Sequence, residues 1–176
     1  MMPNPLEPIW DAHQTAGAAL KVVTRCVKVA GIDRARAFSN ALFRGLTDRQ
    51  CLDLIDTAQA EIDDSAVLSL YASFEAILRQ HVVQQAYHLH GAQHPTQDFG
   101  VALAGLFSES CDRIRMDDLA NLFVSAAGQP LVAQVGNIRT YRHWLAHGRG
   151  WTQPPTVTPR FAYQTLTAFL QSAALI

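Results

Sequence analysis

The residues best suited to chemistry lie together in the stretch YRHWLAHGRGW, which spans residues 141–151. It contains two arginines, two histidines and two tryptophans. An arginine keeps its positive charge and binds the oxygens of phosphate or carboxylate groups, and a histidine can transfer a proton near neutral pH. This combination indicates a site that holds an anion and carries out acid–base chemistry on it.

Arg142 and His147 are the two residues to which we assign that chemistry. They are five positions apart, which on a helix corresponds to about 140° of rotation and about 7.5 Å of rise. Both can therefore address one phosphodiester only if the helix ends near His147, where Gly148 supplies a break, or if a second subunit supplies half of the site. Arg142 would stabilise negative charge, and His147 would act as general acid or base. For His147 alone, a cap that compensates the helix dipole is the alternative.

A zinc site is the competing interpretation of the histidines. His143 and His147 are spaced i, i+4 and share a helix face, but zinc needs a third and usually a fourth ligand. No HExxH pattern is present, and a cluster of further imidazoles occurs in the segment with His88, His90 and His94. Nothing in the sequence brings that segment to His147, so we expect neither a metal ion nor another cofactor.

The charge balance of the C-terminal third favours an anionic partner. The chain as a whole has a net charge of −1, 49% hydrophobic and 16% charged residues, which fits a folded domain. After Asp118 its only charged side chains are Arg139, Arg142, Arg149 and Arg160. Arg139 is expected to support the site, and Arg149 is either a second phosphate contact or a solvated loop charge.

Apolar residues recur with helical spacing, and no segment shows a convincing strand alternation, so the chain is predicted to be an all-α bundle. Thr47 and Gln50 have the spacing of a capping box, and the proline-rich segment 151–159 is expected to be a loop. The expected helices cover approximately residues 16–31, 33–45, 51–62, 63–91, 99–114, 117–128, 129–148 and 160–176.

Two charged residues stand on apolar stripes of the expected helices. Arg142 lies near the centre of a stripe formed by Leu131, Val135, Ile138, Leu145 and Ala146, and Glu75 lies on the flank of the stripe on the helix at 63–91.

A buried charge needs a partner, so we predict that the two helices are neighbours. Glu75 would then hold Arg142, or Arg142 would turn toward an interface cleft. A structural ion pair, or an arginine stem that reaches solvent, is the alternative. If the pair is fully buried, Glu75→Ala is expected to cost about 3–5 kcal/mol.

The remaining sequence features indicate a cytoplasmic protein. The three cysteines are widely spaced without a CxxC pattern, which fits a reducing compartment and small core residues. The N-terminus lacks the layout of a signal peptide, and no apolar run reaches the roughly 18 residues that a membrane span needs.

The motif at residues 142–147, R-H-x-x-x-H, resembles the R-polar-x-x-x-H signature of HEPN domains, which are all-α nucleotide-binding and ribonuclease domains. YRHWLAHGRGW is similar to a prokaryotic subgroup that runs R-N-x-x-A-H-G-R-x-W. YASFEAIL resembles its aromatic–acidic helix, and the C-terminal amphipathic helix is in keeping with it. The length fits one domain over residues 1–176. The resemblance, which covers about residue 60 to the end, implies an up-and-down four-helix core at about 60–176, with N-terminal helices at 9–58 packed on it.

The resemblance also implies an activity, that of a metal-independent endoribonuclease acting as a homodimer whose two motifs meet in a cleft. Arg142 would bind the scissile phosphate, and His147 would transfer a proton as the 2′-hydroxyl attacks, leaving a 2′,3′-cyclic phosphate and a 5′-hydroxyl. His143 replaces the commoner Asn and would orient its neighbours or touch phosphate. Family members act as toxins with cognate antitoxins, in phage defence and in RNA processing.

Other interpretations remain open at this point. Some family members have lost activity, so a nucleotide-binding regulator or a dimeric protein-interaction module are the alternatives to a nuclease for single-stranded RNA. Tyr141 and Trp151 would stack on bases in such a nuclease, or else are core or interface residues. Trp144 faces away from the Arg142 stripe, toward another helix or a dimer partner.

Overall fold

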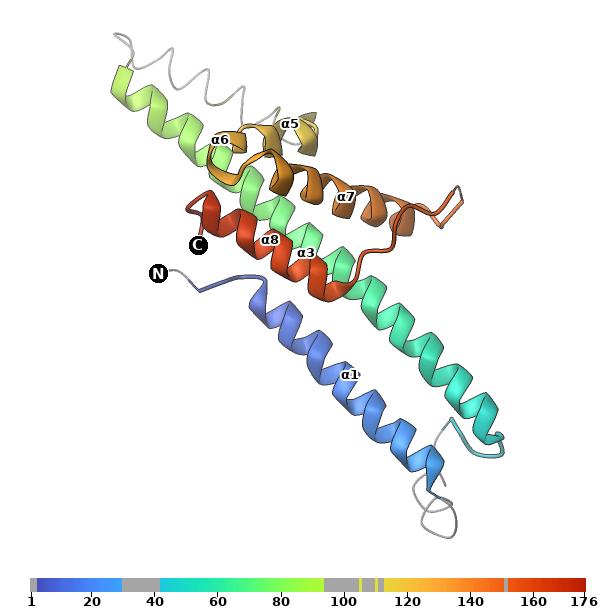
Figure 1. The fold of residues 1–176 in the computed structure, drawn as a ribbon. Helices are drawn as coiled ribbons and strands as arrows, with labels where there is room; N and C mark the ends of the chain where they lie inside the picture. Colours follow the sequence, from blue (N-terminus) through green and yellow to red (C-terminus); the bar gives the residue numbers. More distant parts are fainter. Residues whose placement is uncertain (1–2, 30–41, 94–104, 106–109, 111–112, 151) are drawn as a thin grey trace.

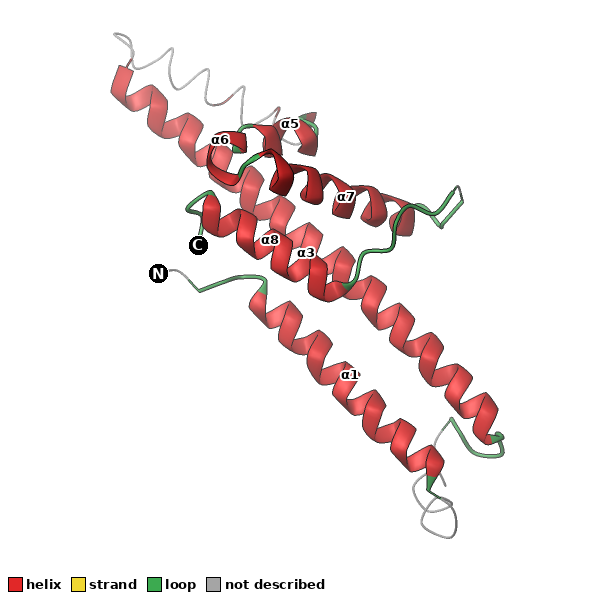
Figure 2. Ribbon diagram, in the orientation of Figure 1, coloured by secondary structure: helices red, strands yellow, loops and turns green. Residues whose placement is uncertain are grey.

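The protein is all-α in its computed structural model, which describes residues 3–29, 42–93, 105, 110, 113–150 and 152–176 (Figure 1). No strand occurs in these ranges (Figure 2), so the prediction of an all-α bundle is confirmed. None of the described helices is long and apolar enough to cross a lipid bilayer. The helices are α1 (Glu7–Lys28), α3 (Asp48–Gln93), α5 (Met116–Asn121), α6 (Val124–Ala127), α7 (Gln129–Ala146) and α8 (Pro159–Ser172).

The 46-residue helix α3 is the element on which the others assemble. Helix α1 packs along its N-terminal half, and α5, α7 and α8 pack on its C-terminal half (Figure 1). Its start is the predicted capping box: the Thr47 N–H donates to Gln50 Oε1 at 2.9 Å, and the Gln50 N–H donates to Thr47 Oγ1 at 3.3 Å.

The predicted division of α3 into two helices, at 51–62 and 63–91, is wrong. No glycine or proline lies between Thr47 and Gly91 to interrupt the backbone hydrogen bonds. The polar pair at the expected break is instead held by neighbouring elements. Asp63 accepts a hydrogen bond at 2.7 Å from His13 of α1, and Asp64 accepts one at 2.9 Å from Tyr141 of α7.

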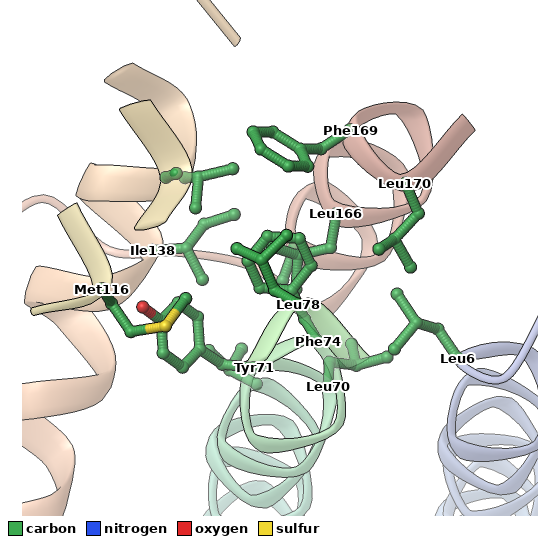
Figure 3. Close-up of a cluster of buried hydrophobic side chains, with 14 of the residues drawn as sticks. Leu6, Leu70, Tyr71, Phe74, Leu78, Met116, Ile138, Leu166, Phe169 and Leu170 are labelled. Carbon is green, nitrogen blue, oxygen red and sulfur yellow. The ribbon is translucent and has the colours of Figure 1, made fainter. Parts of the chain in front are cut away.

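The main core lies where α3, α7 and α8 meet. Phe74 of α3 packs edge-on against Phe169 of α8, with ring centroids 5.3 Å apart. Burial of such aromatic and aliphatic side chains is the main favourable contribution to folding. The core side chains labelled in Figure 3 are Leu6, Leu70, Tyr71, Phe74, Leu78, Met116, Ile138, Leu166, Phe169 and Leu170.

A second, smaller cluster lies toward the other end of α3. It consists of the buried residues Val27, Cys51 and Ile55 from α1 and α3, with partly buried neighbours around them. Cys51 is a core residue, as the cysteine spacing suggested, whereas Cys26 is only partly buried and both are free thiols. Cys111 lies outside the described residues.

The remaining predicted elements have mixed outcomes. Helix α7 and the non-helical stretch 152–158 match their predicted positions closely, and α8 begins as predicted but ends at Ser172, four residues before the predicted end. Helix α1 starts nine residues earlier than expected, with a proline in its first turn, where proline is tolerated. The single helix expected at 117–128 is two short ones, α5 and α6, and Phe123 between them contacts Phe169. The helices expected at 33–45 and 99–114 fall mostly outside the described residues.

Candidate functional site

The packed face of α7 explains where Arg142 points. Its buried residues recur at every third position, and such a row turns by about 60° per step because a helix has 3.6 residues per turn. At the C-terminal end the packed face therefore runs through Tyr141 and Trp144, and has turned away from Arg142. The predicted stripe is correct at Val135 and Ile138, which are buried, and in part at Leu131 and Leu145, which pack against the core partly buried, whereas Ala146 is exposed. The buried residues of α7 are Val132, Val135, Ile138, Tyr141 and Trp144.

Arg142 is half-buried on the flank of this face. Its guanidinium carbon lies 6.0 Å from the centroid of the Tyr71 ring, within the range of a cation–π contact. It forms no ion pair with any acidic residue in the part of the chain that the structure describes. Helices α3 and α7 are neighbours, as predicted, but the guanidinium meets an aromatic ring there and not a carboxylate.

Glu75 does not hold Arg142, so this alternative is wrong. Its carboxylate accepts two hydrogen bonds from Arg79, one turn further along α3, at 3.0 Å from Nε and 2.8 Å from Nη2. Arg79 also donates from Nη1 to the Ile114 carbonyl at 3.2 Å. The pair therefore joins α3 to the segment that leads into α5, and Glu75 has a structural role.

His143 and His147 lie side by side at the C-terminal end of α7. Their ring centroids are 4.2 Å apart, and both residues are exposed. Desolvation by neighbouring groups, followed by the positive charges of His147, Arg139 and Arg142, lowers the pKa of His143 below its usual value. His143 is therefore unprotonated at neutral pH, which lets it accept a proton or a hydrogen bond.

The end of α7 is set by a Schellman motif. The Arg149 N–H donates to the Trp144 carbonyl at 3.1 Å, and the Gly148 N–H donates to the Leu145 carbonyl at 3.4 Å. This pattern needs a residue of positive φ just after the cap, and Gly148 has φ +77°. The predicted break at Gly148 is confirmed, and His147 is the cap residue.

Arg149 belongs to a cluster of ion pairs that ties the chain after α7 back onto α3. It pairs with Asp64 and, at 3.6 Å, with Glu61, and its guanidinium carbon lies 5.6 Å from the Trp144 ring centroid. Tyr141 is buried and donates its hydroxyl to Asp64 at 2.9 Å. Burial, followed by the Asp64 hydrogen bond, raises the pKa of Tyr141 to about 12.

These contacts change the roles expected for Arg149 and Tyr141. The Arg149 side chain is 45% exposed, but its Nη2 is bound to Asp64 and Glu61, so it is a loop cation tied to α3 and not an isolated solvated charge. Tyr141 is a core residue, so its ring is not open to a base. Trp144 is buried and contacts Tyr141, with the two rings 5.7 Å apart. Trp151 lies outside the described residues.

Arg139 lies one turn before Arg142, at i, i+3 spacing on the same broad side of α7. Its Nη2 pairs with Asp117 of α5 at 2.8 Å. The carboxylates that bind Arg139 and Arg149 were not expected, because they come from elements distant in sequence. The sequence does contain a signal for the acidic site that binds Arg149, because Glu61 and Asp64 are spaced i, i+3 and share one face of α3.

No three His, Cys, Asp or Glu side chains gather to hold a metal ion in the described ranges. The side chains of His88, His90 and His94 are outside those ranges. The site that the geometry defines is thus a cation-rich helix end: Arg142, His143 and His147, with Arg139 and Arg149 bound to carboxylates on either side.

The chain matches no protein-family model, no curated protein and no solved structure. The class that fold and site define is therefore an all-α helical domain that presents one arginine and two histidines at the end of α7. The likeness of this segment to the HEPN signature is a likeness of the motif alone.

Proposed function

We propose that this protein is a metal-independent endoribonuclease of the HEPN type, which cleaves single-stranded RNA as a homodimer. The observation that supports the proposal best is the state of Arg142. It is half-buried and permanently charged, and no described carboxylate neutralises it. An arginine in such surroundings gains stability from an incoming anion such as a phosphodiester.

His147, with His143 beside it, supplies the proton transfers that the reaction needs. The RNA 2′-hydroxyl loses its proton to His147, its oxygen bonds to phosphorus, and the bond from phosphorus to the 5′-oxygen breaks as that oxygen takes up the proton from His147. The products are a 2′,3′-cyclic phosphate and a 5′-hydroxyl. His147 transfers the proton, and the unprotonated His143, in ring contact with it, orients it or accepts a hydrogen bond. Arg142 stabilises the charge on the phosphorane oxygens.

The test is cleavage of single-stranded RNA by the purified chain in EDTA, with Arg142→Ala and His147→Ala beside the wild type. The matched control is Arg160→Ala, which removes an exposed arginine of α8. We expect cleavage that persists in chelator, ends in a 2′,3′-cyclic phosphate, and disappears in both site variants but not in the control. Equal cleavage by all the proteins would reject the proposed site.

Mixing the two inactive variants tests the dimer. If Arg142 of one protomer works with His147 of its partner, a mixed dimer contains one intact site and activity is partly restored. If both residues act within one protomer, the mixture stays inactive. Sedimentation of the wild type as a monomer at assay concentrations would contradict the homodimer.

A phage-defence or toxin role follows from the same resemblance. Expression of the wild type in a bacterial host is expected to stop growth, whereas His147→Ala is expected not to. Rescue by the product of a neighbouring gene would identify a cognate antitoxin.

A further inference from the structure

A pocket separate from the cation-rich helix end lies between α3, α5 and α7. Its volume is about 190 Å³, which is roughly the liquid volume of six water molecules. Met116, Ala120, Val132 and Val135 contribute apolar wall, whereas Asn121 and Gln129 contribute amide groups. The polar atoms that matter most come from Tyr71, Arg139 and Asp117.

Two buried polar atoms of this pocket have no hydrogen-bond partner among the described residues: the Tyr71 hydroxyl and Arg139 Nε. Tyr71 is 1% exposed, and Figure 3 shows its hydroxyl pointing toward Met116, which lines the pocket. Burial, followed by the charge of Glu75, raises the pKa of Tyr71 well above its usual value. The hydroxyl therefore stays protonated and can donate. Buried donors nearly always have an acceptor, so two such atoms on one pocket indicate a bound group.

The position of Asp117 restricts what that group can be. In a guanidinium, Nε–H and Nη2–H lie along one edge and point the same way. Since Arg139 Nη2 already reaches Asp117 at 2.8 Å, an acceptor on Nε would lie beside the Asp117 carboxylate. A second anion would be repelled there. In a neutral group with a carbonyl next to an N–H, the carbonyl would instead accept from Arg139 or Tyr71, and the N–H would donate toward Asp117.

We propose that this pocket binds a small neutral ring with an amide edge, a carbonyl adjacent to an N–H, as found in lactams and in pyrimidine bases. The carbonyl accepts from Tyr71 and Arg139, the N–H donates to Asp117, and Val132 and Val135 cover the ring faces. The inference does not depend on ribonuclease activity, because it uses neither His143 nor His147 and its readout is binding.

The test is a nuclear magnetic resonance titration of the full chain with uracil and with 2-pyrrolidinone, which share the amide edge. N-methyl-2-pyrrolidinone, which lacks the N–H, and acetate, an anion, are the comparison ligands. We expect saturable shifts in amides of residues 132–139, with Kd near the millimolar range. Tyr71→Phe and Arg139→Lys should each raise Kd roughly three- to tenfold, the effect of one hydrogen bond. Tyr163→Phe, whose hydroxyl faces Asn4, is the matched control.

The outcomes of the titration distinguish a site for nucleobases from a site for lactams in general. Binding of uracil but not of 2-pyrrolidinone identifies a nucleobase site, and equal binding identifies a more general lactam site. Absence of saturable shifts with both ring amides, unchanged Kd in Tyr71→Phe and Arg139→Lys, or equal binding of the N-methyl compound or of acetate would each overturn the proposal.

Discussion

The two sides of the C-terminal end of α7 carry the same kind of charge in opposite settings. On one side, Arg149 is bound by Asp64 and Glu61 of α3 and lies over the Trp144 ring. On the other side, Arg142 lies over the Tyr71 ring and pairs with no described carboxylate, next to His143 in sequence. The sequence alone does not distinguish these arginines, whereas their partners do.

The difference indicates which arginine serves the fold and which is left for a ligand. An arginine that is held by carboxylates has its charge compensated and joins two elements. An arginine that meets only a ring keeps most donors available for an anion. Arg149 therefore attaches the chain after α7 to α3, and Arg142 is the better candidate to bind phosphate.

The largest expected effect comes from replacing each of these two arginines in a separate variant. Arg142→Gln should lower RNA cleavage by about 10²–10³-fold, the usual cost of losing one group that stabilises transition-state charge, with the melting temperature unchanged. Arg149→Gln should instead lower the melting temperature and retain cleavage below it. Cleavage rates and thermal unfolding of the two variants give the comparison, and the reverse pattern would contradict the assignment.

The second largest effect is expected at Asp64, the carboxylate that binds Arg149. Asp64→Asn removes a charge that serves both Arg149 and Tyr141, and should lower the free energy of unfolding by about 1–3 kcal/mol. The matched control is Asp53→Asn, because Asp53 forms an exposed ion pair with Arg49 at 3.5 Å. For this control we expect the free energy of unfolding to fall by less than about 0.5 kcal/mol. If urea denaturation gave the same loss of unfolding free energy for Asp64→Asn and Asp53→Asn, the contacts of Asp64 would contribute no more to stability than an exposed ion pair.

Alkaline titration gives an independent measure of the same cluster. The pKa of Tyr141 in the folded protein, about 12, lies above its ordinary value of 10.0. Its contribution to stability is therefore fully present below pH 10 and is lost as the pH rises through 12. In Asp64→Asn the pKa of Tyr141 should fall, as measured from tyrosinate absorbance. An unchanged titration would mean that burial alone raises it.

A smaller effect is expected at Glu75, which sequence analysis had linked to Arg142. Glu75→Gln weakens a partly exposed i, i+4 pair with Arg79, so we expect a loss of about 1 kcal/mol, well below that of a stranded buried charge. RNA cleavage should not change, because Glu75 holds Arg79. A strong loss of cleavage at normal stability would show that Glu75 acts on the site.

The smallest effect concerns the charges around His143. Since Arg142 is one of the groups that lower its pKa, Arg142→Gln should move the pKa of His143 toward 6.5, as followed by nuclear magnetic resonance. His81 is the internal control, because burial alone lowers its pKa. Stability linked to His143 is present above pH 6.5 and is lost as the pH falls below it, since the unfolded chain takes up the proton first. Equal shifts of both histidines would indicate a global change.

Sequence reasoning succeeded where the signal is local. The Thr47 capping box, the extent of α7 and its end at Gly148 depend on residues within one or two turns of one another, and all are confirmed. The break expected within α3, between residues 62 and 63, was wrong, and Asp63 and Asp64 lie inside the helix. They are tolerated in mid-helix since His13 and Tyr141 bind them.

The partners of the site residues could not be predicted in the same way. Asp64 and Arg149 are 85 positions apart, and Arg139 pairs with a carboxylate on a short helix. Which acid meets which arginine depends on how α3, α5 and α7 pack, and helical periodicity does not encode that. The periodic stripe also misplaced Arg142, because a row of every third residue rotates around the helix.

The uninterrupted α3 has one further consequence. At 1.5 Å per residue its 46 residues extend about 69 Å, with the main core around one half and the small Val27–Cys51–Ile55 cluster around the other. Backbone amides in the half around this small cluster should exchange with deuterium sooner than those enclosed by α7 and α8. A single helix would then display a gradient of protection along its own axis, from a readily opened outer end to a slowly exchanging centre.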